Sequence, residues 1–159
     1  MRYILILCLS LLLFAKGSYD FDEYKYISAT EKTKKQSGTI IFEDKRTIIT
    51  YFEPKYKQII SSENNVTITG KSGKTYALKG KALFYTKLFI DVMSQLGDLQ
   101  KLKNSKEFTL TQSKDGYIVT FNGDIKDAVS KAEVKVEKSE VKSFKLFMNN
   151  GDTLEIIKK

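Results

Sequence analysis

Thr47-Ile48-Ile49-Thr50-Tyr51-Phe52, followed at once by Glu53-Pro54, is the run that most clearly predicts a β-strand with a sharp end. β-Branched and aromatic residues favour the pleated, half-buried surface of a sheet. Pro54, the only proline, follows the run, where its missing N–H costs no ladder bond. Similar runs, separated by turn residues, predict four neighbouring strands at Thr39–Phe42, Lys57–Ser61, Val66–Thr69 and Thr75–Leu78.

The hydrophobic period changes to that of a helix in two places. Between about Gly80 and Gly97 a broad apolar face recurs at helical spacing, and Gly97 is a typical helix end. A shorter helix is predicted from Tyr19 to about Thr30, where apolar residues recur at three-residue spacing. The two helices would each carry one apolar stripe that must be buried.

A period of two returns in the second half of the chain. Apolar residues alternate with polar ones around Phe108–Leu110, Tyr117–Phe121, Ala132–Val136 and Phe144–Met148, and again at Leu154 and Ile156. Lys114-Asp115-Gly116 and Asn149-Asn150-Gly151-Asp152 are typical of tight hairpin turns. The chain is therefore expected to form about ten short strands, which tight turns would join as antiparallel neighbours.

This pattern predicts an α+β, mainly β fold. A large antiparallel sheet should curve strongly and form an incomplete barrel around or under the two helices, because its concave face is the only large apolar surface available to them. The interior is then either a filled core or an apolar pocket with a helical lid. The residue pattern alone leaves both alternatives open.

Residues 1–17 are typical of a secretory signal peptide, which leaves a single domain at 18–159. Arg2 precedes an apolar run from Ile4 to Phe14, and Ala15-Lys16-Gly17 supplies small residues at the cleavage site. The run is shorter than the ~20 residues of a membrane span. Cys8, the only cysteine, would leave with the leader. A cysteine-free exported domain favours a bacterial periplasm over a eukaryotic secretory route.

The composition argues against catalysis and against nucleic-acid binding. The sequence contains no histidine, which is the commonest metal ligand and the side chain that titrates near neutral pH, so we expect no metal, no cofactor and no enzyme. Acidic groups such as Asp20/Asp22/Glu23 and Asp124/Asp127 could in principle serve acid–base chemistry or bind calcium, but they are typical of helix starts and turns. The net charge is +8, but lysines alternate with acids, and Arg46 is the only arginine after the leader, so no nucleic-acid partner is expected.

The order of these elements resembles the outer-membrane lipoprotein carrier (LolA) superfamily, and the second half resembles its shorter members. The resemblance is carried by Ser37–Phe42, by Ile48–Pro54 with Lys57–Ile60, and by Leu83–Leu102 with its internal Gly97-Asp98-Leu99. It continues through Phe108–Leu110 and Tyr117–Phe121 to Asn150–Leu154. It covers nearly all of residues 18–159 as a pattern of residue types without a short defining motif.

The resemblance implies a periplasmic, Gram-negative carrier that binds acyl chains of lipoproteins or lipids under its helices. Its partners would be a transient inner-membrane donor and an outer-membrane acceptor, and it would act as a monomer. The predicted cavity wall consists of apolar strand residues: Phe52, Ile59, Ile68, Tyr76, Phe108, Leu110, Tyr117, Val119, Phe121, Val134, Val136, Phe144, Leu146, Met148, Leu154 and Ile156. The predicted lid consists of helical residues: Phe84, Leu88, Phe89, Val92 and Met93.

The best-known carriers of this superfamily have an Arg-Pro pair after the first strand, and its arginine helps to close the lid. The corresponding stretch here is Glu43–Thr47, which has no proline, so Arg46 is the candidate latch. Two alternatives use the same fold differently. One is a lipid sensor or transporter accessory that hands nothing on, and the other is a structural envelope protein with a filled core.

Overall fold

The computed structural model describes residues 17–159, so the predicted signal peptide lies outside the described residues except for Gly17. The described part folds into eleven strands, two α-helices and two 3-10 turns. Their bounds are β1 Gly17–Ile27, η1 Ser28–Thr30, β2 Lys32–Phe42, β3 Arg46–Glu53, β4 Lys57–Ser62, β5 Val66–Gly70, β6 Thr75–Ala77, α2 Gly80–Leu96, α3 Leu99–Asn104, β7 Phe108–Ser113, β8 Gly116–Phe121, η2 Gly123–Asp127, β9 Val129–Glu137, β10 Glu140–Met148 and β11 Thr153–Lys158.

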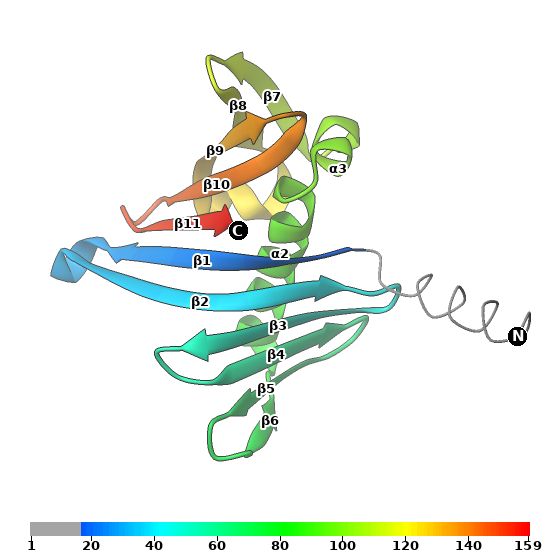
Figure 1. The fold of residues 1–159 in the computed structure, drawn as a ribbon, viewed down its shortest axis with the longest axis vertical. Helices are drawn as coiled ribbons and strands as arrows, with labels where there is room; N and C mark the ends of the chain where they lie inside the picture. The colour runs from blue at the N-terminus through cyan, green and yellow to red at the C-terminus, as the bar shows by residue number, and fades with distance from the viewer. Residues whose placement is uncertain (1–16) are drawn as a thin grey trace, which may run out of the picture.

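All eleven strands belong to one open antiparallel sheet, in the order β6-β5-β4-β3-β2-β1-β11-β10-β9-β8-β7 (Figure 1). The two halves of the chain meet where β1 pairs with β11, from Phe21 opposite Lys158 to Tyr26 opposite Thr153. The short strand β6 and the strand β7 form the two edges, so the sheet is not closed. This confirms the predicted α+β, mainly β class with an unclosed, curved sheet.

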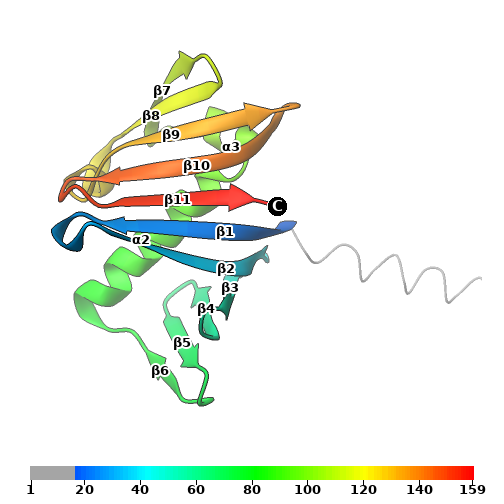
Figure 2. The same ribbon diagram turned by 60° about the vertical axis from the view of Figure 1, so that its left-hand side comes forward.

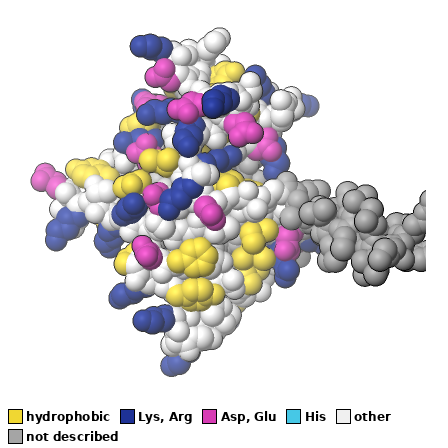
Figure 3. Space-filling model, viewed as in Figure 1, with side chains coloured by type: hydrophobic (Ala, Val, Ile, Leu, Met, Phe, Trp, Pro, Cys, Tyr) yellow, Lys and Arg dark blue, Asp and Glu magenta, His cyan; other side chains and the backbone are white. Residues whose placement is uncertain are grey.

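Helix α2 crosses one face of this sheet, and the opposite face is turned to solvent (Figure 2). Ile90, Val92, Met93 and Leu96 of α2 are buried and form one hydrophobic core with the strands. The face that looks away from α2 carries lysines and carboxylates together with small groups of adjoining apolar side chains (Figure 3), and Ile41, Ile48 and Ile60 form one outward cross-strand row. A half-covered antiparallel sheet has this division of residues.

The register explains how the sequence separates the two faces. One cross-strand row faces α2 and is apolar: Tyr19, Ile40, Ile49, Ile59, Ile68 and Tyr76. The next row faces away and is polar: Asp20, Thr39, Thr50, Gln58, Thr69 and Thr75. Because successive side chains of a strand point to opposite faces, a shift of one residue would exchange these rows, so the apolar pattern fixes the register.

The helix predicted for residues 19–30 is wrong, because residues 17–27 form the central strand β1. Phe21 and Glu23 are buried towards α2, while Asp20 and Asp22 point to the other face. The inward-facing glutamate hid this alternation in the sequence, and the spacing of Phe21, Tyr24 and Ile27 imitated a helical stripe. Pairing of β1 with β2 and β11 on both sides overrides that weak local preference.

The other helix and strand predictions for the described residues hold with two adjustments. The helix at residues 80–97 is confirmed as α2, which ends at Leu96, and both predicted hairpin turns join strand neighbours, β7 with β8 and β10 with β11. The predicted ten strands become eleven once β1 is counted, and β2 begins at Lys32 rather than near Thr39. The second helix is α3, where Asp98 accepts hydrogen bonds from the backbone N–H groups of Gln100 and Lys101.

Candidate functional site

The interior under α2 is closely packed beneath the second half of the helix and less completely covered beneath its first half. The four buried residues of α2 all lie in its second half, from Ile90 onward. In its first half Phe84 and Tyr85 are 50% and 51% exposed, and their rings meet edge to face. Across the sheet, the apolar row that starts at buried Ile40 ends at Tyr76, which is 56% exposed. The first half of α2 therefore covers the N-terminal sheet half incompletely.

A half-open cavity of about 520 Å³ lies between the middle of α2, from Tyr85 to Met93, and the sheet. That volume is in the range of cavities that hold small organic ligands. Its apolar wall is contributed by β3, β4, α2 and the β10–β11 hairpin: Ile49, Tyr51, Ile59, Tyr85, Phe89, Ile90, Met93, Met148 and Leu154. Polar side chains enter from one border: Glu23, Lys25, Lys57, Thr86, Asp152 and Thr153.

Glu23 is the most buried charged group of this cavity, with 5% of its surface exposed. Its carboxylate accepts a hydrogen bond from the hydroxyl of Tyr51 at 2.7 Å and another from Nε2 of Gln36 at 3.0 Å. Burial, followed by the neighbouring charge of Glu23, raises the pKa of Tyr51 well above its usual value. Tyr51 therefore stays a hydrogen-bond donor at every physiological pH and holds the carboxylate in place.

Lys57 and Asp152 complete the polar border. The ammonium group of Lys57 lies 4.3 Å from the centroid of the Tyr51 ring, a cation–π contact. Burial lowers the pKa of Lys57, and the nearby charge of Lys25 acts in the same direction. Asp152 accepts hydrogen bonds from the backbone N–H of Ser28 at 2.9 Å and from its hydroxyl at 3.0 Å, which lowers the pKa of Asp152.

The predicted cavity wall divides into three groups in the structure. Ile59, Met148 and Leu154 line the cavity, and Ile68 and Tyr76 extend the same row of the sheet beyond it. A second group is packed in the filled core under the C-terminal sheet half: Phe108, Val119, Phe121, Val134, Phe144, Leu146 and Ile156. A third group, which is partly buried, packs against that core: Leu110, Tyr117 and Val136.

Phe52 does not belong to the covered interior and is a correction to the predicted wall. It is 56% exposed and sits beside the register shift that separates the pairs Ser37–Glu53 and Gly38–Tyr51. Its neighbour Tyr51 takes the inward position instead. The residue pattern predicted the strand correctly, but it assigned Phe52 rather than Tyr51 to the face that looks towards α2 at this irregular end of β3.

The predicted lid residues do not share one environment. Phe89 and Met93 line the cavity, while Leu88 and Val92 line a separate hollow next to Glu107 and Ile125. Phe84 is exposed. Sequence reasoning missed the inward-facing Tyr85, Thr86 and Ile90, although they lie on the same helix. It missed Glu23 because residues 19–30 were predicted as a helix with Glu23 near its start, and it missed Lys57 because lysines in strands were assigned to the solvated face.

Arg46 contacts its own turn rather than the helix. Its guanidinium is hydrogen bonded to the carboxylate of Glu43, three residues earlier. The contact from α2 to this region comes from Lys87, whose ammonium donates to the carbonyl oxygens of Ser62, at 2.6 Å, and Glu63. The structure therefore places Lys87, not the predicted Arg46, in the position of a contact that holds the helix to the sheet.

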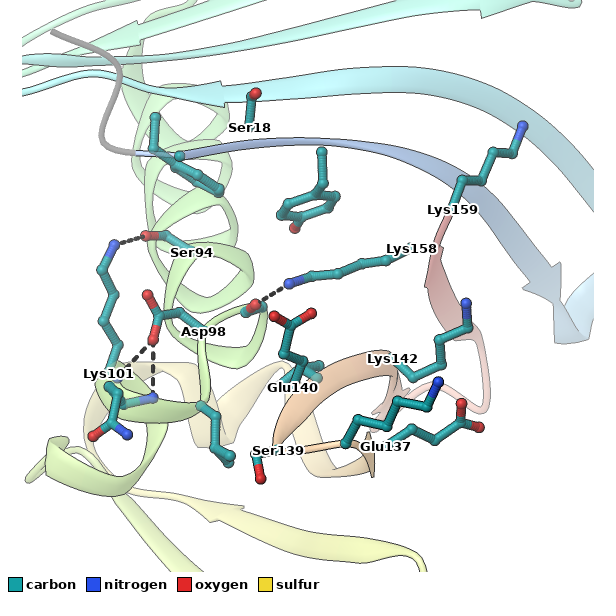
Figure 4. Close-up of a pocket in the computed structure, with 18 residues that line it drawn as sticks. Ser18, Ser94, Asp98, Lys101, Glu137, Ser139, Glu140, Lys142, Lys158 and Lys159 are labelled. Atoms are coloured by element: carbon teal, nitrogen blue, oxygen red, sulfur yellow. Dashed lines mark hydrogen bonds between the residues drawn. The ribbon is translucent and has the colours of Figure 1, made fainter. Parts of the chain in front are cut away.

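A second, larger hollow of about 620 Å³ lies beside the start of β1, α3 and the β9–β10 turn (Figure 4). Most of the residues that line it are polar or charged. Lysines and carboxylates surround it, and Lys158 spans it to donate a hydrogen bond to the carbonyl oxygen of Gly97. The hydroxyl of Tyr19 is buried beside it without a hydrogen-bond partner in the described part of the chain, and burial raises the pKa of Tyr19. This hollow lacks the continuous apolar wall of the cavity under α2.

Residues 17–159 contain no group of three or more His, Cys, Asp or Glu side chains arranged to hold a metal ion. Within the same range, no helix has the length and apolar character to cross a membrane.

No family model matches the chain, and no curated protein matches it. Among solved structures it is similar to a DUF1329 family protein from Desulfovibrio piger, with 10% identity, a TM-score of 0.47 and coverage of 99% of this chain and 89% of that chain. It is also similar to a LolA superfamily protein from Nitrosomonas europaea, with 8% identity, a TM-score of 0.40 and coverage of 89% and 83%.

A domain from Vibrio parahaemolyticus described as an outer membrane lipoprotein-sorting protein matches with 7% identity, a TM-score of 0.36 and coverage of 98% of this chain and 89% of that chain. At these identities and TM-scores the similarities carry no argument about function.

Proposed function

We propose that this protein binds the acyl chain of a lipid or lipoprotein in the cavity beneath α2 and carries it through the periplasm without changing it chemically. Delivery would run from an inner-membrane donor towards an outer-membrane acceptor, with the protein acting as a monomer. The observation that supports this function is the apolar cavity of about 520 Å³ under a helix whose first half is incompletely packed.

The energetics favour such a ligand. Each methylene group removed from water contributes about 0.8 kcal/mol, so an acyl chain seated against Ile49, Ile59 and Phe89 would gain most of its affinity from contact with the wall. Met93 and Met148 are unbranched and flexible, which suits a wall that adjusts to guests of different shape. Release would require α2 to move only at its loosely packed first half.

The test uses two isoleucines that are neighbours on β4 but face opposite sides. Ile59 lines the cavity, while Ile60 pairs with Ile48 on the face away from α2. Titration with a fluorescent fatty acid should show saturable binding to the natural protein. Ile59→Trp should lower the affinity at least about tenfold by filling the cavity, and Ile60→Trp should leave it unchanged. A folded Ile59→Trp variant with full affinity would contradict this site.

A structural envelope protein is the second candidate, and the filled C-terminal half favours it. Phe144 and Leu146 are fully buried, so about half of the covered face needs no ligand to be packed. Native mass spectrometry of protein extracted from its own periplasm separates the candidates, because a carrier or a sensor should retain an acyl-containing mass. Transfer of that mass to acceptor vesicles would then distinguish a carrier from a sensor.

A further inference from the structure

The charged side chains at the polar border of the cavity differ in their hydrogen bonds: the carboxylates have hydrogen-bond donors, and the lysines have no acceptor among the described residues. Both carboxylates are occupied by neutral donors, Glu23 by Tyr51 and Gln36, and Asp152 by Ser28. The ammonium groups of Lys25 and Lys57 each have a carboxylate nearby, Asp152 for Lys25 and Glu23 for Lys57, but neither donates a hydrogen bond to it. Within residues 17–159, neither lysine has a carboxylate oxygen within the 4.0 Å of an ion pair.

Lys25 also acts electrostatically on Lys57, which lines the same cavity. The positive charge of Lys25 lowers the pKa of Lys57, in addition to the effect of burial. The charge of Glu23 acts on the pKa of Lys57 in the opposite direction and more strongly than that of Lys25, but Glu23 makes no hydrogen bond or ion pair with that ammonium. A half-buried ammonium that contacts only an aromatic ring keeps hydrogen-bond donors free for a ligand.

We propose that the cavity selects amphiphiles with an anionic head group, a carboxylate or a phosphate, which Lys25 and Lys57 bind while the acyl tail lies against Ile49, Ile59 and Phe89. This inference rests on the proposed function, because it assigns a ligand class to the same cavity. An anion between the two lysines would replace their mutual repulsion by two charge-assisted hydrogen bonds. A neutral amphiphile with a tail of the same length would gain only the contacts of its tail with the cavity wall.

Three amphiphiles with the same twelve-carbon chain test the inference by calorimetric titration: laurate, 1-lauroyl-lysophosphatidate and neutral 1-dodecanol. The protein should bind at least one of the two anionic compounds at least about tenfold more tightly than the alcohol. The tighter of the two anions then identifies the head group as carboxylate or phosphate. Equal affinity for all three would overturn the selectivity while leaving the acyl-binding function in place, whereas no binding of any compound would overturn both.

Lysine variants locate the effect. Lys25→Gln and Lys57→Gln should each weaken binding of the preferred anion about fivefold or more and leave dodecanol binding unchanged. Lys145→Gln is the matched control, because Lys145 lies on the strand β10 opposite Glu133 and Glu155 and lines no part of the cavity. Anion selectivity that survives in the folded double variant Lys25→Gln/Lys57→Gln would overturn the assignment.

Discussion

Lys87 of α2 donates a hydrogen bond to the carbonyl oxygen of Ser62, 2.6 Å away at the end of β4, and a second one to Glu63. These contacts are made by the half of the helix that is least packed against the sheet. They connect the roof of the cavity to the end of β4, outside the buried core.

The first prediction concerns this contact. Lys87→Met should lower the free energy of unfolding by only about 1 kcal/mol, since the ammonium is partly solvated, but should increase opening of α2 over the cavity. Hydrogen exchange of residues 80–90 should become faster than in the natural protein, while that of residues 91–96 stays slow. Lys81→Met, an exposed lysine on the same helix, is the control. Unchanged exchange in residues 80–90 would contradict the latch role.

The second prediction concerns the buried carboxylate. Tyr51→Phe removes the hydroxyl that donates to Glu23 at 2.7 Å and leaves a buried acceptor with one donor fewer. Urea unfolding should show a loss of about 1–3 kcal/mol. In the double variant Tyr51→Phe/Glu23→Gln the losses should not add, because both changes disturb the same hydrogen bond. Tyr26→Phe is the control and should change stability by less than about 0.5 kcal/mol. Strict additivity would show that the two groups are not coupled.

The third prediction concerns acid pH and Asp22. Hydrogen bonds from Lys159 and Ser37, with a further contact from Lys35, lower the pKa of Asp22 from 3.8 to about 2. Because this pKa is lower in the folded state, its stabilising effect is present above pH 4 and is lost as the pH falls from about 4 to 2. The stability difference between the natural protein and Asp22→Asn should shrink over that interval.

Added salt distinguishes the ion pairs of Asp22 from its hydrogen bond with Ser37 as sources of this pH-dependent stability. In about 0.5 M NaCl the part that comes from the ion pairs with Lys35 and Lys159 should decrease, since both lysines are largely exposed. The part that comes from the hydroxyl of Ser37, 2.6 Å from the carboxylate, should remain. A difference between the two proteins that stays constant from pH 5 to pH 2 would contradict the assigned role of Asp22.

The strands and the central helix could be predicted from the sequence because their apolar periods are regular. Ile40, Ile49 and Ile59 sit at inward positions of three successive strands, and turn residues mark where each strand ends. The first strand could not be predicted because Glu23 occupies an inward position. Its reason for being there, a hydrogen bond from Tyr51 twenty-eight residues later, is a tertiary contact that no local period contains.

The candidate site was less predictable than the fold. A period of two identifies the residues that face the helix, but it does not reveal whether the helix lies close enough to fill the space between them. Phe121 and Ile59 have equivalent patterns in the sequence, yet Phe121 is packed in the core and Ile59 lines the cavity. The difference arises from where α2 buries its side chains, which is in its second half.

The last prediction uses this difference. Phe121 is 3% exposed and packs edge to face on Phe108, with ring centroids 5.3 Å apart, so Phe121→Ala should cost about 3–5 kcal/mol of stability. Phe89 lines the cavity from the partly packed helix, so Phe89→Ala should cost less stability but lower the affinity for an acyl chain roughly ten- to hundredfold. Urea unfolding and fatty-acid titration of both variants measure the two quantities. If Phe89→Ala loses stability as Phe121→Ala does, and binding per folded molecule is unchanged, then the first half of α2 is core rather than the roof of a binding cavity.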